Sequence, residues 1–66
     1  MQIIVNGTPK QAPEHLTLAE LLQELELNPE TTIVELNRNI IQRKDYSETY
    51  LDEGDKLELV RVVGGG

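Results

Sequence analysis

Three consecutive glycines, Gly64, Gly65 and Gly66, stand last in the sequence and point most directly to chemistry. We expect Gly66 to carry a free terminal carboxylate, whose pKa of about 3.3–3.7 leaves it ionised at neutral pH. Glycine lacks a Cβ, so a glycine tail can pass through a channel too narrow for side chains. A reacting carboxylate on a tether would need this composition, and a floppy end or a leftover linker would share it.

The composition restricts which other chemistry the chain can perform. Its 66 residues predict one small domain, residues 1–63, followed by a flexible tail, residues 64–66. The sequence has no cysteine and one histidine, which excludes disulfides, a cysteine nucleophile and a histidine metal cluster. Its net charge of −6 argues against nucleic acid as a partner. Neither a signal peptide nor a run of roughly 20 apolar residues is present, so we expect a cytoplasmic protein without membrane contact.

Turn and cap signals predict the first half of the fold. Asn6-Gly7 favours a type I′ hairpin between strands at 2–5 and 8–12, and Pro9 places the second strand at a sheet edge. Thr17 with Glu20 forms a capping box, which predicts a helix that begins there. Its apolar face recurs at helical spacing, and Asn28-Pro29 is expected to end it.

Apolar runs and turns predict the second half. Strands are expected at 32–36, 40–41 and 57–63, and segment 42–49 is polar and irregular, with room for one helical turn. The first and last strands are the most apolar and should be central and paired. This order predicts an α+β fold in which a mixed sheet of about five strands carries one helix on one face and leaves the other face open.

Strand alternation assigns side chains to the two faces of the sheet. Ile3 and Val5 should face the helix. Ile4, Val60 and Val62 should then form an apolar patch on the open face, and such patches often mark docking sites. A β-bulge near Arg61 would reverse this phase, and neighbouring side chains could instead cover the valines.

The remaining polar candidates have ordinary structural interpretations. His15 lacks a second histidine and is expected on a surface loop, and the acidic turn Asp52-Glu53-Gly54-Asp55 lacks calcium-loop spacing. No catalytic residue and no metal ligand is therefore predicted. Two tyrosines should cover the core edge with their hydroxyls in water, and three arginines should form weak surface ion pairs. These residues are Tyr46, Tyr50, Arg38, Arg43 and Arg61.

The order and spacing of these motifs resemble the ThiS family of sulfur carrier proteins, within the ubiquitin-like β-grasp superfamily. The resemblance covers the whole chain. It rests on Asn6-Gly7, the helix 17–25, Val34-Glu35-Leu36-Asn37, Ile40-Ile41 with Arg43, Gly54-Asp55 and the terminal glycines. The family's glycine pair corresponds to Gly65 and Gly66, and Gly64 is additional.

The resemblance implies a function in thiamin (thiazole) biosynthesis. An E1-like adenylating enzyme would use ATP and Mg²⁺ to convert the Gly66 carboxylate to an acyl adenylate. Sulfur from a cysteine desulfurase or another persulfide donor would replace AMP, and thiazole synthase would consume the resulting thiocarboxylate. The chain would itself bind no cofactor and would act as a protein co-substrate, not an enzyme.

Two alternatives remain open from the sequence. The chain could carry sulfur in another pathway, as the small subunit of molybdopterin synthase does. It could also be a ubiquitin-like binding module or a modifier that is joined to lysines, without sulfur chemistry.

Overall fold

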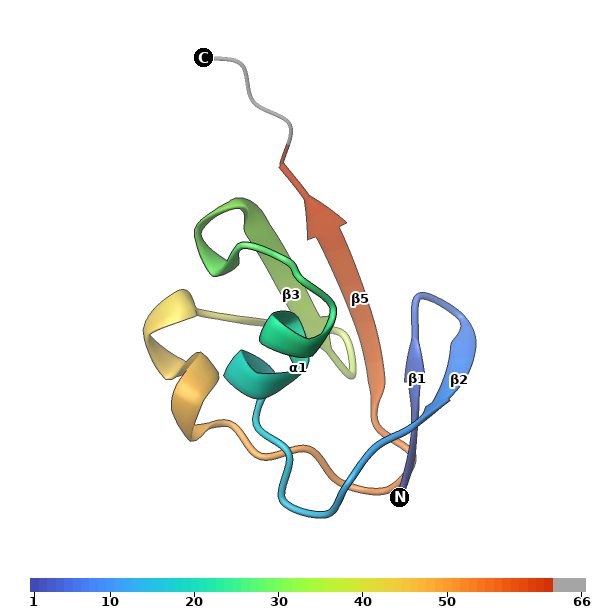
Figure 1. Ribbon diagram of the computed structural model, residues 1–66. Helices are drawn as coiled ribbons and strands as arrows, with labels where there is room; N and C mark the ends of the chain where they lie inside the picture. Colours follow the sequence, from blue (N-terminus) through green and yellow to red (C-terminus); the bar gives the residue numbers. More distant parts are fainter. Residues whose placement is uncertain (63–66) are drawn as a thin grey trace.

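The computed structural model describes residues 1–62, and Gly64, Gly65 and Gly66 lie outside the described residues. A five-stranded sheet in the order β2-β1-β5-β3-β4 carries helix α1 on one face (Figure 1). β5 pairs in parallel with β1 and antiparallel with β3, which confirms a mixed sheet with the first and last strands paired. The strands are β1 (Gln2–Val5), β2 (Thr8–Gln11), β3 (Thr32–Leu36), β4 (Asn39–Ile41) and β5 (Lys56–Arg61), and α1 is Leu18–Glu24.

Left-handed residues form both tight hairpins. Asn6 (φ 50°) and Gly7 (φ 81°) connect β1 to β2, and β2 lies at the sheet edge as the proline predicts. Asn37 (φ 49°) and Arg38 (φ 73°) connect β3 to β4 in the same way without a glycine. Asparagine tolerates this region better than most residues, which explains its place at the start of both turns.

The capping box at the start of α1 is confirmed, but the predicted helix end is wrong. The Glu20 N–H donates to the Thr17 hydroxyl at 3.1 Å, and the Thr17 N–H donates to the Glu20 carboxylate at 2.9 Å. The helix ends at Glu24, because Glu26 adopts φ 59° and the Leu27 N–H returns to the Leu22 carbonyl at 2.8 Å. These contacts close the last turn as a Schellman motif does. Asn28 instead caps a short 3-10 helix, Pro29–Thr31.

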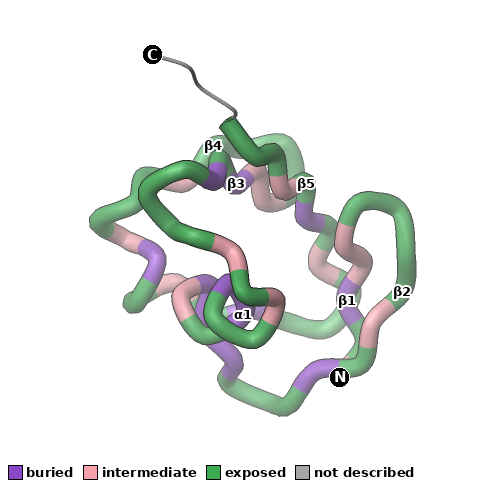
Figure 2. The backbone as a smooth tube through the Cα atoms, turned by 45° about the horizontal axis from the view of Figure 1, so that its top comes forward, coloured by how far each residue is buried: buried purple, intermediate pink, exposed green. Residues whose placement is uncertain are grey.

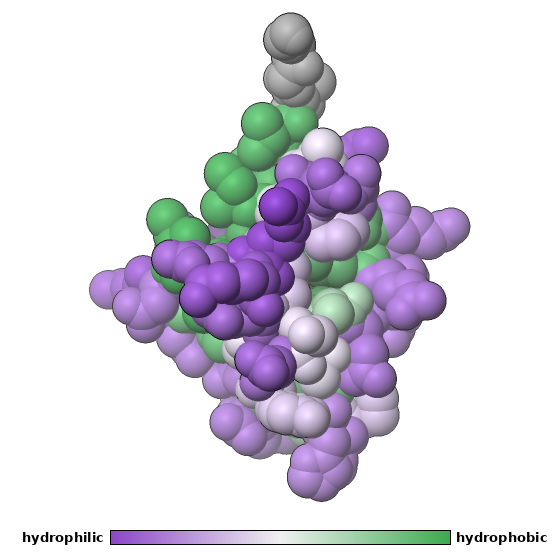
Figure 3. Space-filling model, turned by 90° about the vertical axis from the view of Figure 1, so that its left-hand side faces the viewer, coloured by the Kyte–Doolittle hydropathy of each residue, from purple (hydrophilic) through white to green (hydrophobic). Residues whose placement is uncertain are grey.

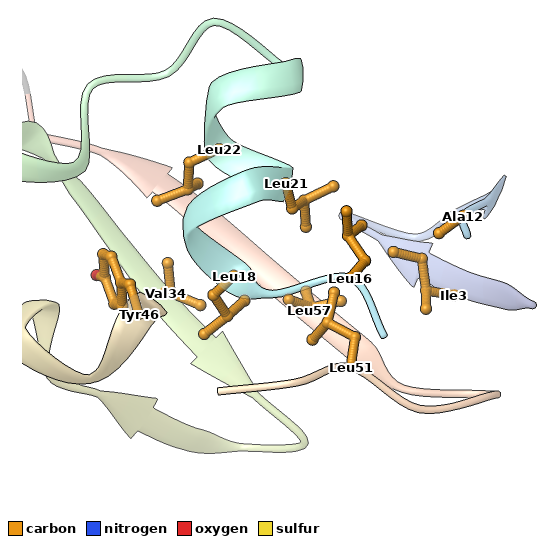
Figure 4. Close-up of a cluster of buried hydrophobic side chains, with 10 residues drawn as sticks. All are labelled: Ile3, Ala12, Leu16, Leu18, Leu21, Leu22, Val34, Tyr46, Leu51 and Leu57. Carbon is orange, nitrogen blue, oxygen red and sulfur yellow. The ribbon is translucent and has the colours of Figure 1, made fainter. Parts of the chain in front are cut away.

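The core lies between α1 and the inner face of the sheet, and the buried positions in Figure 2 concentrate there. Leucines of the helix point toward the strands and meet side chains from β1, β3 and β5 (Figure 4). The members are Ile3, Ala12, Leu16, Leu18, Leu21, Leu22, Val34, Tyr46, Leu51 and Leu57. A hydrophobic cluster of this kind stabilises a small domain that has no disulfide.

Segment 42–49 contributes more to the core than the sequence indicates. Residues Arg43–Glu48 form a 3-10 helix that brings Tyr46 into the core, where only 4% of the residue is exposed. The Tyr46 hydroxyl donates to the Thr32 carbonyl at 3.0 Å, so the expectation of a hydroxyl in water is wrong for this residue. Tyr50 is 59% exposed.

Candidate functional site

β5 leads directly to the predicted reacting tail. The strand ends at Arg61, earlier than the predicted 57–63, but the Val62 N–H still donates to the Thr31 carbonyl at 2.7 Å. Gly64, Gly65 and Gly66, the predicted tail and sulfur-carrying residues, lie beyond this point and outside the described residues. The described part of the site is therefore the surface of the sheet around the end of β5.

The outer face at the end of β5 is apolar. β3 and β5 pair in continuous register from Thr32 opposite Arg61 to Leu36 opposite Leu57, so no bulge reverses the alternation within this pairing. Val60 and Val62 accordingly lie outside, 53% and 49% exposed. A neighbouring side chain does not bury either valine.

Ile33 lies beside the two exposed valines, Val60 and Val62, whereas Ile4 does not. Ile33 stands directly opposite Val60 and is 43% exposed. Ile4 is half-buried and stands opposite Lys56, four residues from Val60 along β5. Figure 3 shows hydrophobic atoms gathered along one side of the molecule toward the end where the described chain stops. We refer to Ile33, Val60 and Val62 as the apolar patch.

The other half of the same face is charged. Glu35 on β3 stands directly opposite Glu58 on β5, with Ile40 of β4 on the far side of Glu35. Asn37, Arg38 and Lys56 line a shallow hollow together with the two glutamates. Like charges directly opposite in a sheet are destabilising, so we expect this pair to reduce stability. The open face thus has an apolar part at the end of β5 and a charged part further from that end, which also carries the exposed Ile40.

The described residues contain no arrangement typical of a catalytic or metal centre. Within residues 1–62, no three His, Asp or Glu side chains come together in a way that could hold a metal ion. His15 is an exposed loop residue with φ 64°. Asp55 of the acidic turn accepts from the Asn37 side chain at 3.0 Å and from the Asp52 N–H at 2.7 Å, which gives it a structural role.

Two further observations concern ionisation and membranes. Burial raises the pKa of the Tyr46 hydroxyl above its ordinary value of 10.0. That group is a hydrogen-bond donor inside the core, on the other face of the sheet from the apolar patch.

In the part of the chain that the structure describes, no helix has the length and apolar character needed to cross a bilayer.

A mixed five-stranded sheet with one helix on one face defines a β-grasp domain, and solved structures match it closely. One match is the crystal structure of a thiamine biosynthesis protein (ThiS) from Geobacter metallireducens. The two sequences are 35% identical, and the structures align with a TM-score of 0.86 over the full length of both chains. The ThiS family profile matches residues 3–66. The chain therefore belongs to the ThiS family.

Two curated relatives extend this comparison. The chain is 29% identical over 66 residues to the sulfur carrier protein ThiS of Escherichia coli, with full coverage of both. It is 39% identical over 66 residues to a thiazole synthase of Magnetococcus marinus, in which it spans 20% of the relative's length. A segment similar to this chain thus occurs within a longer polypeptide that bears the name thiazole synthase.

Proposed function

We propose that this protein is a sulfur carrier of thiamin biosynthesis, in which the Gly66 carboxylate is adenylated and then converted to a thiocarboxylate. The observation that carries the proposal is the ThiS family match, which runs through the terminal glycines. The fold supports it, because the apolar patch adjoins the strand from which the tail leaves. The protein acts as a co-substrate and leaves the catalysis to its partners.

The chemistry accounts for the need of an activating partner. A carboxylate is ionised at neutral pH and is a poor electrophile, but it can attack the α-phosphate of ATP, which breaks the α–β phosphoanhydride bond and releases pyrophosphate. The resulting acyl adenylate has AMP as a good leaving group. A persulfide sulfur then attacks the acyl carbon and AMP departs. A thiol then cleaves the S–S bond of the resulting acyl disulfide: it forms a new disulfide with the donor's sulfur and leaves the thiocarboxylate on Gly66. The partner must enclose the adenylate, since water would hydrolyse it.

The partners follow from these steps. An E1-like adenylating enzyme supplies the site for ATP and Mg²⁺, and a cysteine desulfurase or another persulfide donor supplies the sulfur. Thiazole synthase accepts the sulfur, and the similarity to part of a thiazole synthase chain supports that assignment. We place the protein in the cytoplasm with these enzymes.

Docking through the apolar patch would present the tail to the adenylating enzyme. Three extended residues span at most about 10 Å, which is enough for Gly66 to enter a cleft while the domain remains outside. Side chains at Gly65 or Gly66 would crowd such a channel. The sequence predicts Ile4 together with Val60 and Val62 on this docking surface, and Ile4 stands opposite Lys56 of β5.

Intact-mass spectrometry tests the proposal directly. The protein is incubated with the adenylating enzyme, ATP, Mg²⁺ and a persulfide source, and we expect one oxygen atom to be replaced by sulfur. A matched variant with one alanine added after Gly66 should remain unchanged. An unaltered mass of the natural chain with an enzyme that is active on another ThiS protein would overturn the proposal.

A second step assigns the pathway. Thiocarboxylate on this protein should be consumed by thiazole synthase and not by the large subunit of molybdopterin synthase. Consumption only by the latter would indicate the other sulfur carrier pathway. Conjugates with lysine side chains, in place of thiocarboxylate, would indicate a ubiquitin-like modifier.

A further inference from the structure

The hydrogen bonds of β5 alternate between its two edges, and the alternation can be followed residue by residue. The Val62 N–H donates to Thr31, and the Asn37 N–H donates to the Lys56 carbonyl at 2.8 Å, so even-numbered residues of β5 bond toward β3. Leu57 and other odd-numbered residues form the non-hydrogen-bonded pairs with β3 and turn their N–H and C=O groups to the β1 side.

β1 covers only the first part of that edge. The Asn6 N–H donates to the Leu57 carbonyl at 2.9 Å, and there the backbone of β1 turns away into the hairpin. The Asn6 side chain provides one further hydrogen bond on this edge of β5, because its Oδ1 accepts from the Leu59 N–H at 2.8 Å. Its Nδ2 lies 3.4 Å from the Leu59 carbonyl, a weaker contact.

Arg61 is the next residue on this edge. By this alternation its backbone N–H and C=O point away from β3, and no loop, turn or side-chain group within residues 1–62 forms a hydrogen bond with them. Figure 1 shows β5 extending past the β1–β2 hairpin, so on the β1 side no strand of the described chain lies beside its last part. A central strand of the sheet therefore has an open edge at the point where it leads to the reacting tail.

We propose that this open edge of β5 receives an extended strand of the adenylating enzyme, which pairs with the Arg61 backbone. The inference rests on the proposed function, since it names how that partner holds this chain. Unpaired strand edges are templates for strand addition, in which main-chain bonds supply affinity and side-chain alternation supplies specificity.

The side chains around Arg61 define the chemistry of the incoming strand. Arg61 lies on the face that carries α1, as Leu57 and Leu59 do, whereas Val60 and Val62 lie on the open face. A strand beside Arg61 would therefore place one residue near the guanidinium and its two neighbours on the side of the valines. Opposite charges pair favourably across strands, so we expect an acidic residue between two apolar ones.

A second copy of this chain fits the edge poorly. Each chain carries a net charge of −6, so two copies repel each other. Symmetric antiparallel pairing centred on the open residue would also place Arg61 directly opposite Arg61 of the second copy. Like charges in that position are destabilising.

Strand pairing at Arg61 would also assist the adenylation step. It would fix the backbone direction immediately before the tail, so that less freedom is lost when Gly66 enters the enzyme. Interactions that restrict a bound segment increase the effective concentration of its reacting group. The apolar patch and the open edge are continuous through Val60 and Val62, so one partner surface can contact both.

Amide hydrogen exchange measured by NMR tests the pairing, with full-length protein alone and in complex with the adenylating enzyme. We expect exchange of the Arg61 N–H to slow by about tenfold or more in the complex, because a bonded amide exchanges only when it opens. The Gln11 N–H is the matched reference. It points away from β1 on the opposite sheet edge and should exchange equally in both states.

A backbone substitution provides the second test. Chemical synthesis can replace the Arg61 N–H with an ester oxygen, which removes one donor and keeps the side chain. Loss of one hydrogen bond should weaken binding about three- to tenfold. The same replacement at Gln11 should leave binding unchanged. The ladder with β3 does not use the Arg61 N–H, so folding should be preserved in both variants.

The outcomes separate the pairing from the proposed function. Sulfur transfer with no change in Arg61 exchange, or equal binding by the two ester variants, would overturn the pairing and leave the proposed function intact. If the Arg61 amide of the chain alone becomes more protected from exchange as the protein concentration rises, the edge pairs with a second copy. That result would also overturn the pairing with the enzyme. Failure of the enzyme to bind the natural chain would overturn both.

Discussion

Replacing Val60 with aspartate separates docking from folding. Val60 is 53% exposed and stands opposite Ile33 at the centre of the apolar patch. Full burial of a valine side chain contributes about 1.5–3 kcal/mol of free energy. Because Val60 is about half buried by folding, folding gains roughly half of this free energy, and burial of the remaining surface on docking can contribute the rest. Val60→Asp should therefore lower the free energy of unfolding by about 1–2 kcal/mol, including the poor strand propensity of aspartate.

The expected loss in binding is larger. Docking would cover the carboxylate without providing a donor, at a cost of about 1–3 kcal/mol in addition to the lost apolar contact. Because about 2–4 kcal/mol corresponds to roughly 30- to 1,000-fold in Kd, affinity for the adenylating enzyme should fall within that range.

Two measurements on three variants check this prediction. Denaturant unfolding gives the stability, and titration calorimetry with the adenylating enzyme gives the Kd. Gln11→Asp adds the same charge at the far edge of the sheet and should leave the Kd unchanged. Val60→Thr keeps a β-branched side chain and should give an intermediate Kd. If Val60→Asp lowers stability and affinity by equal free energies, Val60 acts in folding alone and the docking argument fails.

Two further predictions concern residues away from the patch. Tyr46→Phe leaves the Thr32 carbonyl without its donor and should cost about 1–2 kcal/mol in chemical unfolding. Burial raises the pKa of the Tyr46 hydroxyl in the folded state. The contribution of this hydroxyl to folding stability is therefore full below the unfolded pKa of about 10 and is lost as pH rises through the folded pKa. The Phe variant lacks the hydroxyl and should lose less stability over that pH range. Equal alkaline losses in both proteins would contradict this. Glu58→Gln removes the repulsion with Glu35 and should raise stability by about 0.2–1 kcal/mol, less at high salt; no gain at low salt would contradict the pairing effect.

Local signals in the sequence predicted the parts of the fold that depend on a few adjacent residues. Asn6-Gly7 predicted the first hairpin because type I′ turns require positive φ at both positions. Thr17 and Glu20 predicted the helix start because the cap is made by those two side chains. The helix end could not be predicted in this way, since Glu26 takes a left-handed conformation that its residue type does not favour.

The membership of the apolar patch needed the structure. Alternation assigned Val60 and Val62 to the open face, but it contains no information on which residues of other strands stand beside them. The parallel register of β1 and β5 places Ile4 opposite Lys56, and the antiparallel register of β3 brings Ile33 to Val60. The alternation of Thr32–Leu36 around buried Val34 was the signal that could have placed Ile33 outside.

The position of β5 connects these observations. A strand that carries a reacting tail would be poorly anchored at a sheet edge, where fraying would alter the direction of the tail. Here β3 holds one side of β5 up to Val62, whereas β1 and the Asn6 side chain hold the other side only as far as Leu59. The strand is thus fixed by the domain on one edge and available on the other. In the proposed function, the enzyme that receives the tail would complete the sheet on that second edge and would contact Val60 and Val62 with the same surface.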